Sequence, residues 1–225
     1  LVSALEHLNG VFAFAFWDSE RAELLLARDR FGVKPLYLCA LRGEGAEAGL
    51  AFSSEVKGLL RAGLTPFQLN LQAHADLLAL TYTPGEQSAV EGVEQLPPGA
   101  WLTWRAPQGS APAQRVLERY WRPQLHEREG ERLTLDDVAA WLRSDLTRAV
   151  SERLVADVPV GIFLSGGLDS TGLVYAAHQA GRQDINTFTV RFEEAGYDES
   201  GFARRVADHF KTRHHEELVR PKPEE

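Results

Sequence analysis

The sequence predicts an α/β protein made of two parts, and three features indicate this class. Strand patterns dominate the first third of the chain, as in residues 11–28. Residues 158–219 alternate strand and helix patterns in the order β-α-β-α-β, which is typical of a doubly wound parallel sheet. Residues 105–132 lack steady periodicity and are predicted to be a linker. We therefore expect one domain over residues 1–104 and a second over residues 133–225.

The composition is that of an ordinary globular protein and excludes several classes of function. Of the 225 residues 44% are apolar, and 24 Lys and Arg stand against 32 Asp and Glu, for a net charge of -8. This acidic balance argues against a nucleic-acid partner, because phosphate contacts need a basic surface. No apolar run approaches the roughly 20 residues of a spanning helix, so no membrane contact is expected. The single cysteine, Cys39, cannot form an internal disulfide, which favours the cytoplasm.

The first part opens with a predicted β-hairpin. Bulky residues alternate with alanines over residues 11–17, the period of a strand packed on both faces, and residues 23–28 read as the returning strand. We expect four aromatic side chains of this region in the core: Phe12, Phe14, Phe16 and Trp17.

A charged loop follows, and its role has two readings. Four of its side chains are either solvated or paired with one another: Arg28, Asp29, Arg30 and Lys34. Further strands are predicted over residues 36–40 and 50–53, and a short helix over residues 54–61. Cys39 lies in an apolar strand and is expected to fill the core.

Two helices are predicted from their first residues. Asn70 could cap a helix that runs to about Leu80, with leucines on its apolar side: Leu71, Leu77, Leu78 and Leu80. After a short strand over residues 100–104, Thr134 and Asp137 have the spacing of a capping box. A long amphipathic helix is therefore expected to open the second part.

The second part begins with a continuous apolar run, typical of a parallel strand that is buried on both faces. Its predicted elements are strands over 158–164, 186–190 and 214–219, and helices over 171–180 and 200–210. In the second helix, Phe202, Val206 and Phe210 share one face.

The break between the first strand and helix carries the main chemical signal. Gly166 and Gly167 let a ligand approach the backbone, whose N–H groups and helix dipole favour an anion such as phosphate. Ser165 and Ser170 add hydroxyl donors. Because bare phosphate would repel Asp169, this carboxylate is better explained as a ligand to Mg²⁺ that bridges it to pyrophosphate oxygens. The alternative is a tight strand-to-helix turn with an exposed Asp.

These residues carry a family resemblance. The run Ser165-Gly166-Gly167-Leu168-Asp169-Ser170 matches the pyrophosphate loop of ATP pyrophosphatases, and residues 156–164 look like the asparagine synthetase branch. Further stretches are similar to glutamine-hydrolysing asparagine synthetases: residues 187–190, 197–200 and 206–216, and upstream 8–18, 27–37 and 52–57.

The resemblance implies an N-terminal-nucleophile glutaminase portion followed by an ATP-pyrophosphatase-type synthetase portion. Such enzymes adenylate aspartate with ATP and Mg²⁺, and ammonia from glutamine then displaces AMP. The resemblance assigns contacts with ATP and pyrophosphate to Leu164, Ser165, Gly166, Gly167, Leu168, Asp169, Ser170 and Val190, with Asp169 as the metal ligand. It also suggests a homodimer, and it places the charged loop near the interface between the domains.

Departures from the family pattern limit these expectations. The family's nucleophilic cysteine is the first residue of the mature chain, whereas Leu1 stands here, so no catalytic residue is assigned. The family's downstream acidic motif would lie beyond Glu225. We expect a fragment that alone makes no product. Two alternatives stay open: a related enzyme acting on another carboxylate, such as a β-lactam synthetase, and a nucleotide-binding remnant without turnover.

Two smaller clusters have competing interpretations. His214, His215 and Glu216 could suggest a metal, but adjacent histidines on a strand point to opposite faces, which favours a structural strand end. The run 197–199 is either an acidic helix cap or part of a substrate pocket.

Overall fold

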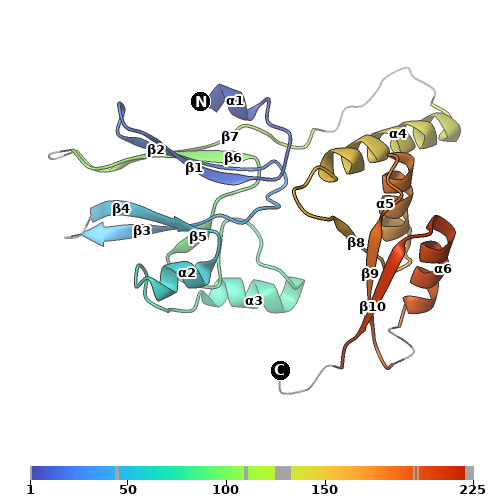
Figure 1. Ribbon diagram of the computed structural model, residues 1–225. Helices are drawn as coiled ribbons and strands as arrows, with labels where there is room; N and C mark the ends of the chain where they lie inside the picture. Colours follow the sequence, from blue (N-terminus) through green and yellow to red (C-terminus); the bar gives the residue numbers. More distant parts are fainter. Residues whose placement is uncertain are drawn as a thin grey trace. The chain divides into compact units, whose positions relative to one another are not determined.

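The computed structural model describes residues 2–43, 46–108, 111–124, 133–194, 196 and 198–220. The chain divides into two compact units, Leu1–His126 and Glu127–Glu225 (Figure 1). Helices and strands occur together in it, as expected of the α/β class. Among the described residues, no helix is both long and apolar enough to cross a membrane.

The first unit holds two antiparallel sheets. One has the strand order β1 (Ala13–Asp18), β2 (Glu23–Arg28), β6 (Ala100–Arg105) and β7 (Gln114–Arg119). The other has the order β4 (Ala46–Ser53), β3 (Tyr37–Gly43) and β5 (Val93–Gln95). Three helices accompany them: α1 (Val2–Leu5), α2 (Val56–Arg61) and α3 (Leu71–Leu80). Side chains of both sheets meet in one buried cluster: Leu26, Leu36, Leu38, Leu96, Leu102 and Trp104.

The predicted hairpin is confirmed, but the predicted burial of its aromatic residues is only partly right. β1 and β2 pair from Ala13↔Arg28 to Asp18↔Glu23. Phe12 and Phe14 are partly buried, whereas Phe16 and Trp17 are exposed. The reason is that β1 lies at the edge of its sheet, where other parts of the protein need not cover both faces of a strand.

The sheet continues into the stretch predicted as a linker. β7 lies within residues 105–132 and pairs with β6 from Ala100↔Arg119 to Arg105↔Gln114. Most side chains of this edge strand are exposed. Its polar composition therefore hides the period of two from which a strand is inferred.

Helix α3 begins as predicted but buries a different face. The Asn70 side chain accepts the N–H of Ala73 at 3.1 Å, which confirms the cap. All four leucines of the predicted apolar side are exposed, with Leu78 at 87%. Ala73 is the buried residue instead, so the helix packs through a small side chain.

The second unit alternates helices and strands along the chain. Its elements are α4 (Leu135–Arg153), β8 (Gly161–Phe163), α5 (Leu168–Gln179), β9 (Asn186–Arg191), α6 (Ser200–Phe210) and β10 (Arg213–Leu218). The strands are parallel in the order β10-β9-β8. At the start of α4, both bonds of the predicted capping box between Thr134 and Asp137 are present.

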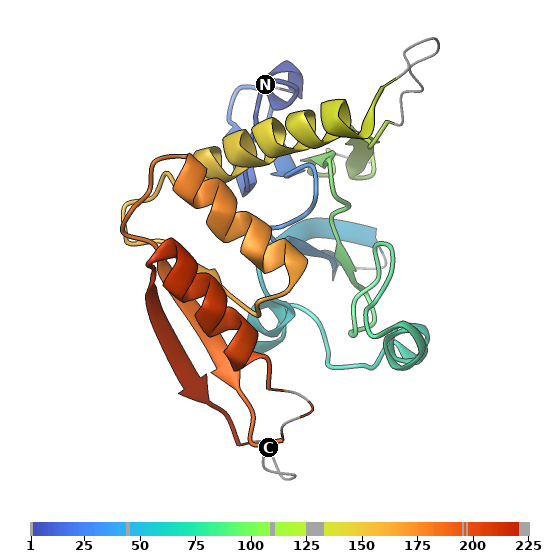
Figure 2. The same ribbon diagram turned by 90° about the vertical axis from the view of Figure 1, so that its right-hand side faces the viewer.

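Helices α5 and α6 lie on the same face of this sheet, and α4 packs across α5 (Figures 1 and 2). Alternation along β9 reflects this: Thr187 and Thr189 are buried, while Phe188 and Val190 are exposed. Phe163 on β8 is 80% exposed, so the prediction of a strand buried on both faces is wrong. A second layer of helices, as in a doubly wound sheet, stays a prediction.

Candidate functional site

The segment predicted to bind phosphate follows Leu164, which hydrogen bonds hold to the sheet. The N–H of Leu164 donates to the carbonyl oxygen of Phe188 at 2.8 Å, and the hydroxyl of Thr189 donates to the carbonyl oxygen of Leu164. Leu164 and Thr189 are both buried. This point is the carboxyl end of β8, the edge at which open α/β sheets bind ligands.

Two serine hydroxyls close the turn over residues 165–170, which we call the glycine loop. Ser165 Oγ lies 3.0 Å from Ser170 Oγ and accepts the N–H of Gly167 at 3.2 Å. Ser170 Oγ also accepts the N–H of Ser165 and donates to the carbonyl oxygen of Gly167, both at 3.3 Å. These bonds tie the beginning of the loop to the first turn of α5.

Helix α6 packs directly on the glycine loop at Gly166. This residue has a φ of 79°, in the left-handed region that favours glycine. A Cβ at this position would lie 2.5 Å from Phe202 Cβ and 2.7 Å from the amide nitrogen of Ala203. Gly166 therefore serves the close packing of α6 against the loop, a role that the sequence did not reveal.

Helix α5 begins at Leu168, three residues earlier than the predicted start at Thr171. Gly167 is its N-cap, and no side chain caps the helix. The N–H groups of Leu168, Asp169 and Ser170 occupy the first helical positions, which have no partner within a helix. Together with the helix dipole, these N–H groups favour an anion at the start of α5.

Asp169 lies in this first turn with an exposed side chain. No group of three or more His, Cys, Asp or Glu that could hold a metal occurs among the described residues. An ion at Asp169 would therefore need oxygen ligands from phosphate or water, which is the usual coordination of Mg²⁺ beside nucleotides. A carboxylate oxygen at an anion-binding helix end fits Mg²⁺ on these terms.

Val190 lies near the carboxyl end of β9, at the same edge of the sheet. On one side it is paired with Glu217 of β10, whereas the β8–β9 pairing ends at Phe163↔Phe188. Among the described residues, the backbone of Val190 therefore has no strand partner on the side of β8. Leu164 and Val190 therefore lie at the same edge of the sheet.

A groove of about 700 Å³ borders the glycine loop between α5 and α6. Phe202, Val206 and Phe210 do share one face of α6, but this face lines the groove, while Ala203 and Ala207 are buried. The Arg205 guanidinium lies 4.6 Å from the centre of the Phe202 ring. Its position beside the loop had no signal in the sequence.

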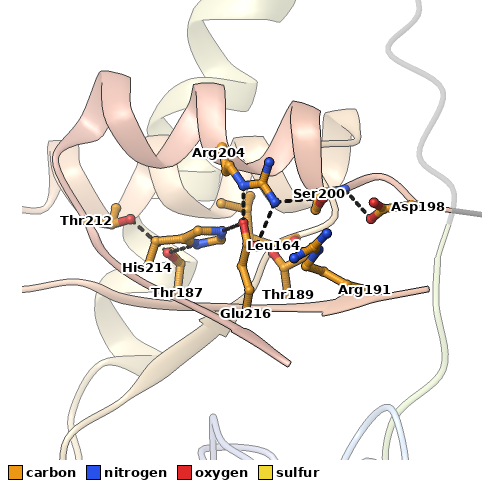
Figure 3. A network of polar contacts seen from close by, with 10 residues as sticks. All are labelled: Leu164, Thr187, Thr189, Arg191, Asp198, Ser200, Arg204, Thr212, His214 and Glu216. Atoms are coloured by element: carbon orange, nitrogen blue, oxygen red, sulfur yellow. Dashed lines mark hydrogen bonds and ion pairs between the residues drawn. The ribbon is translucent and has the colours of Figure 1, made fainter. Parts of the chain in front are cut away.

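A polar network joins α6 to β9 and β10 (Figure 3). His214 and His215 point to opposite faces, as predicted: His214 Nδ1 lies 2.9 Å from Thr187 Oγ1, while His215 stacks on Phe188. Glu216 receives a two-pronged contact from Arg204, which lowers the pKa of this carboxyl. The sequence identified Glu216 only as part of a strand end.

The acidic segment before α6 is described only in part. The Asp198 carboxylate accepts the N–H of Ser200 at 3.1 Å, and this bond lowers the pKa of Asp198. The N-cap residue of α6 is Glu199, whose side chain makes no cap bond. Tyr197 lies outside the described residues.

In the charged loop of the first unit, Arg28 and Asp29 are paired with the backbone, whereas Lys34 is exposed. Asp29 is buried, and its carboxylate accepts the N–H groups of Phe12, Phe31, Val33 and Lys34 at 3.0–3.3 Å. The Arg28 guanidinium donates to the carbonyl oxygens of Gly32, Lys34 and Leu96 at 2.6–2.7 Å. These hydrogen bonds therefore give the loop a structural role.

Cys39 is 1% exposed and packs against Leu59, Val90 and Val93, so the prediction of a core residue is confirmed. Burial raises the pKa of its thiol, which suits packing and disfavours a nucleophile.

Comparison with known proteins assigns a family to each unit. Residues 2–121 match the family described as glutamine amidotransferase domain, and residues 141–223 match asparagine synthase. The chain belongs to the glutamine-hydrolysing asparagine synthetase family. The glycine loop of this family member lies within the asparagine synthase match.

Several curated relatives cover nearly all of the chain. Asparagine synthetase 3 of Bacillus subtilis is 31% identical over 97% of this chain and 36% of its own length. Asparagine synthetase 2 of the same organism is 32% identical over 84% of the chain and 25% of its length. Amidase chry2 of Gibberella zeae is 32% identical over 92% of the chain and 31% of its length. The chain thus spans about a third of the length of such relatives.

Proposed function

We propose that the chain belongs to an ATP-dependent amidotransferase that makes asparagine from aspartate. In this reaction the aspartate carboxylate attacks the α-phosphate of ATP, and pyrophosphate leaves. Ammonia from glutamine then attacks the acyl carbon of the adenylate, and AMP leaves. The observation that carries the proposal is the glycine loop, closed by its serines and followed at once by the uncapped start of α5.

Each residue of the site has a role in this proposal. The N–H groups of Leu168, Asp169 and Ser170 donate to pyrophosphate oxygens, preorganised for the charge that develops there. Gly166 and Gly167 permit the close approach of the pyrophosphate to the loop backbone. The Ser165 and Ser170 hydroxyls are further donors to it. At the sheet edge, Leu164 contacts ATP and the backbone of Val190 borders the adenine, as the family resemblance implies.

Mg²⁺ held by Asp169 would offset the negative charge on the pyrophosphate oxygens. Asp169 lies on the first turn of α5, next to the same N–H groups that face the anion. Its exposed carboxylate is thereby oriented by the helix and leaves the loop hydrogen bonds undisturbed.

The glutaminase portion supplies the ammonia in this proposal and spans residues 1–104, extended by β7, while residues 133–225 form the synthetase portion. No catalytic residue of glutamine hydrolysis is assigned within the chain. We further propose a cytoplasmic enzyme, which fractionation would test, and a homodimer, which sedimentation would test.

The deciding experiment is carboxylate-dependent exchange between ATP and pyrophosphate by the full-length protein across a panel of acids. We expect exchange with aspartate and its loss in Asp169→Ala, with Asp157→Ala as an acidic control outside the glycine loop. Exchange in Asp169→Ala at the wild-type rate would contradict the metal role. Absence of exchange with every acid would contradict the proposal that the protein is an ATP-dependent enzyme.

A second candidate is a related enzyme that acts on another carboxylate. The similarity to amidases supports it, because chry2 of Gibberella zeae and chyE of Penicillium rubens are each 32% identical over 92% of the chain. In the same panel, exchange with an acid other than aspartate would favour this candidate.

A further inference from the structure

Two arginines and a histidine, from three elements, lie close to Glu216 on β10. Arg204 of α6 contacts both carboxylate oxygens, with its second contact at 2.8 Å. Arg191 of β9 lies 3.6 Å away through Nε, and His214 Nε2 lies 3.4 Å away. The Glu216 side chain is only 19% exposed. This carboxylate therefore joins α6, β9 and β10 at one point (Figure 3).

Arg204 connects this point to the glycine loop through the backbone of α6. It directly follows Phe202 and Ala203, the two residues that press on Gly166. Its guanidinium also lies 3.3 Å from Ser200 Oγ in the first turn of α6. A helix is stiff over one turn, so the ion pair with Glu216 and the contact with Gly166 belong to the same turn of α6.

The other side of the loop depends on β9. Leu164 is held by the backbone of Phe188 and by the hydroxyl of Thr189, and Arg191 on the same strand reaches Glu216. The glycine loop is thus held between β9 and α6, and Glu216 contacts both. An isolated exposed ion pair would contribute little to folding and fix no geometry.

We infer that Glu216 is a positioning residue that sets the shape of the glycine loop for ATP, acting through Arg204. It touches no nucleotide itself, and this inference rests on the proposed function. A two-pronged arginine–carboxylate contact has a defined geometry, which suits this role better than a lysine would.

The test compares ATP binding in the full-length protein, measured by titration calorimetry with Mg²⁺, between wild type, Glu216→Gln, Arg204→Gln and the double variant. We expect each single change to weaken ATP binding about tenfold, since small displacements of a binding group have effects of this order. The double variant should lose no more than the single ones. Glu217→Gln is the matched control, because Glu217 is the exposed neighbour on β10.

A second readout separates positioning from mere stabilisation. The KM for ATP in pyrophosphate exchange should rise in Glu216→Gln, while the KM for the acid and the midpoint of thermal unfolding stay near wild type. Arg204→Lys keeps the charge without the two-pronged contact, and should weaken ATP binding about threefold. Should Glu216→Gln fold poorly, Arg204→Lys still tests the positioning role.

The outcomes are distinct. ATP binding by Glu216→Gln and Arg204→Lys at wild-type affinity would overturn the positioning role and leave the proposed function intact. Losses that multiply in the double variant would show that the two residues do not act through each other. A wild-type protein that binds no ATP would overturn the proposed function, and the inference with it.

Discussion

Replacing Gly166 by alanine tests the packing of α6 on the glycine loop. The new Cβ would lie 2.5 Å from Phe202 Cβ, 2.7 Å from the Ala203 nitrogen and 2.7 Å from the Phe202 carbonyl carbon. Two of these three atoms belong to the backbone of α6, so no side-chain rotation can relieve the overlap. The helix or the loop must move.

The expected loss of stability has two parts. A non-glycine residue at a φ of 79° costs about 1–2 kcal/mol. Overpacking against a well-packed neighbour costs about 1–3 kcal/mol more. Gly166→Ala should therefore lower the free energy of unfolding by about 2–5 kcal/mol.

Gly181 provides a matched control in the same unit. Its φ is 84°, and a Cβ there would meet nothing within 4 Å, so Gly181→Ala carries only the backbone part. Urea denaturation followed by circular dichroism should show Gly166→Ala to be the less stable variant by about 1–3 kcal/mol. Equal stability of the two variants would refute the close approach of α6 to the loop.

Three further predictions concern stability. Burial alone would raise the pKa of Asp29, but the four backbone N–H bonds hold the pKa below its usual value. The carboxylate thus stabilises the fold at neutral pH, and the effect is lost as the pH falls through the folded-state pKa. Asp29→Asn should cost about 2–3 kcal/mol at pH 7 and flatten the acid limb of the stability profile in urea titrations; an unchanged limb would contradict this. Thr134→Ala removes the capping box of α4 and should cost about 1 kcal/mol in the same assay, whereas no loss would contradict the cap. Leu78→Lys changes a side chain that is 87% exposed. It should shift the unfolding free energy by less than about 0.5 kcal/mol, and a loss of about 2 kcal/mol would show that the predicted apolar face of α3 is buried after all.

Local signals explain which elements the sequence predicts well. The hairpin follows from alternation closed by an aspartate turn, in which Asp18 accepts the N–H groups of Glu20 and Arg21 at 3.0 Å. The caps at Asn70 and Thr134 depend on residues three positions apart. Such features are decided within one turn of chain, so sequence is sufficient for them.

Burial depends on partners elsewhere in the chain, and there the predictions fail. The leucines of α3 form a convincing apolar stripe, yet Ala73 is the buried residue. On α6, Ala203 and Ala207 are the buried apolar residues, with Val206 and Phe210 partly buried beside them. Small residues permit close packing of helices, and hydrophobicity patterns underrate them. β7 escaped prediction for the opposite reason, because its exposed edge position requires no apolar side chains.

The glycine loop shows the same division within a single site. The sequence predicts correctly that Ser165, Gly166 and Gly167 lie between a strand and a helix, whereas Asp169 and Ser170 belong to the first turn of the helix. The resemblance assigns a ligand to all five. What the sequence cannot show is that Gly166 also faces a helix some 35 residues further along the chain, as its contacts with Phe202 and Ala203 show. That contact gives Glu216 a route to the loop, because the ion pair to Arg204 acts on the same turn of α6. The shape of the loop therefore depends on residues from β9, α6 and β10 that only the folded sheet brings together.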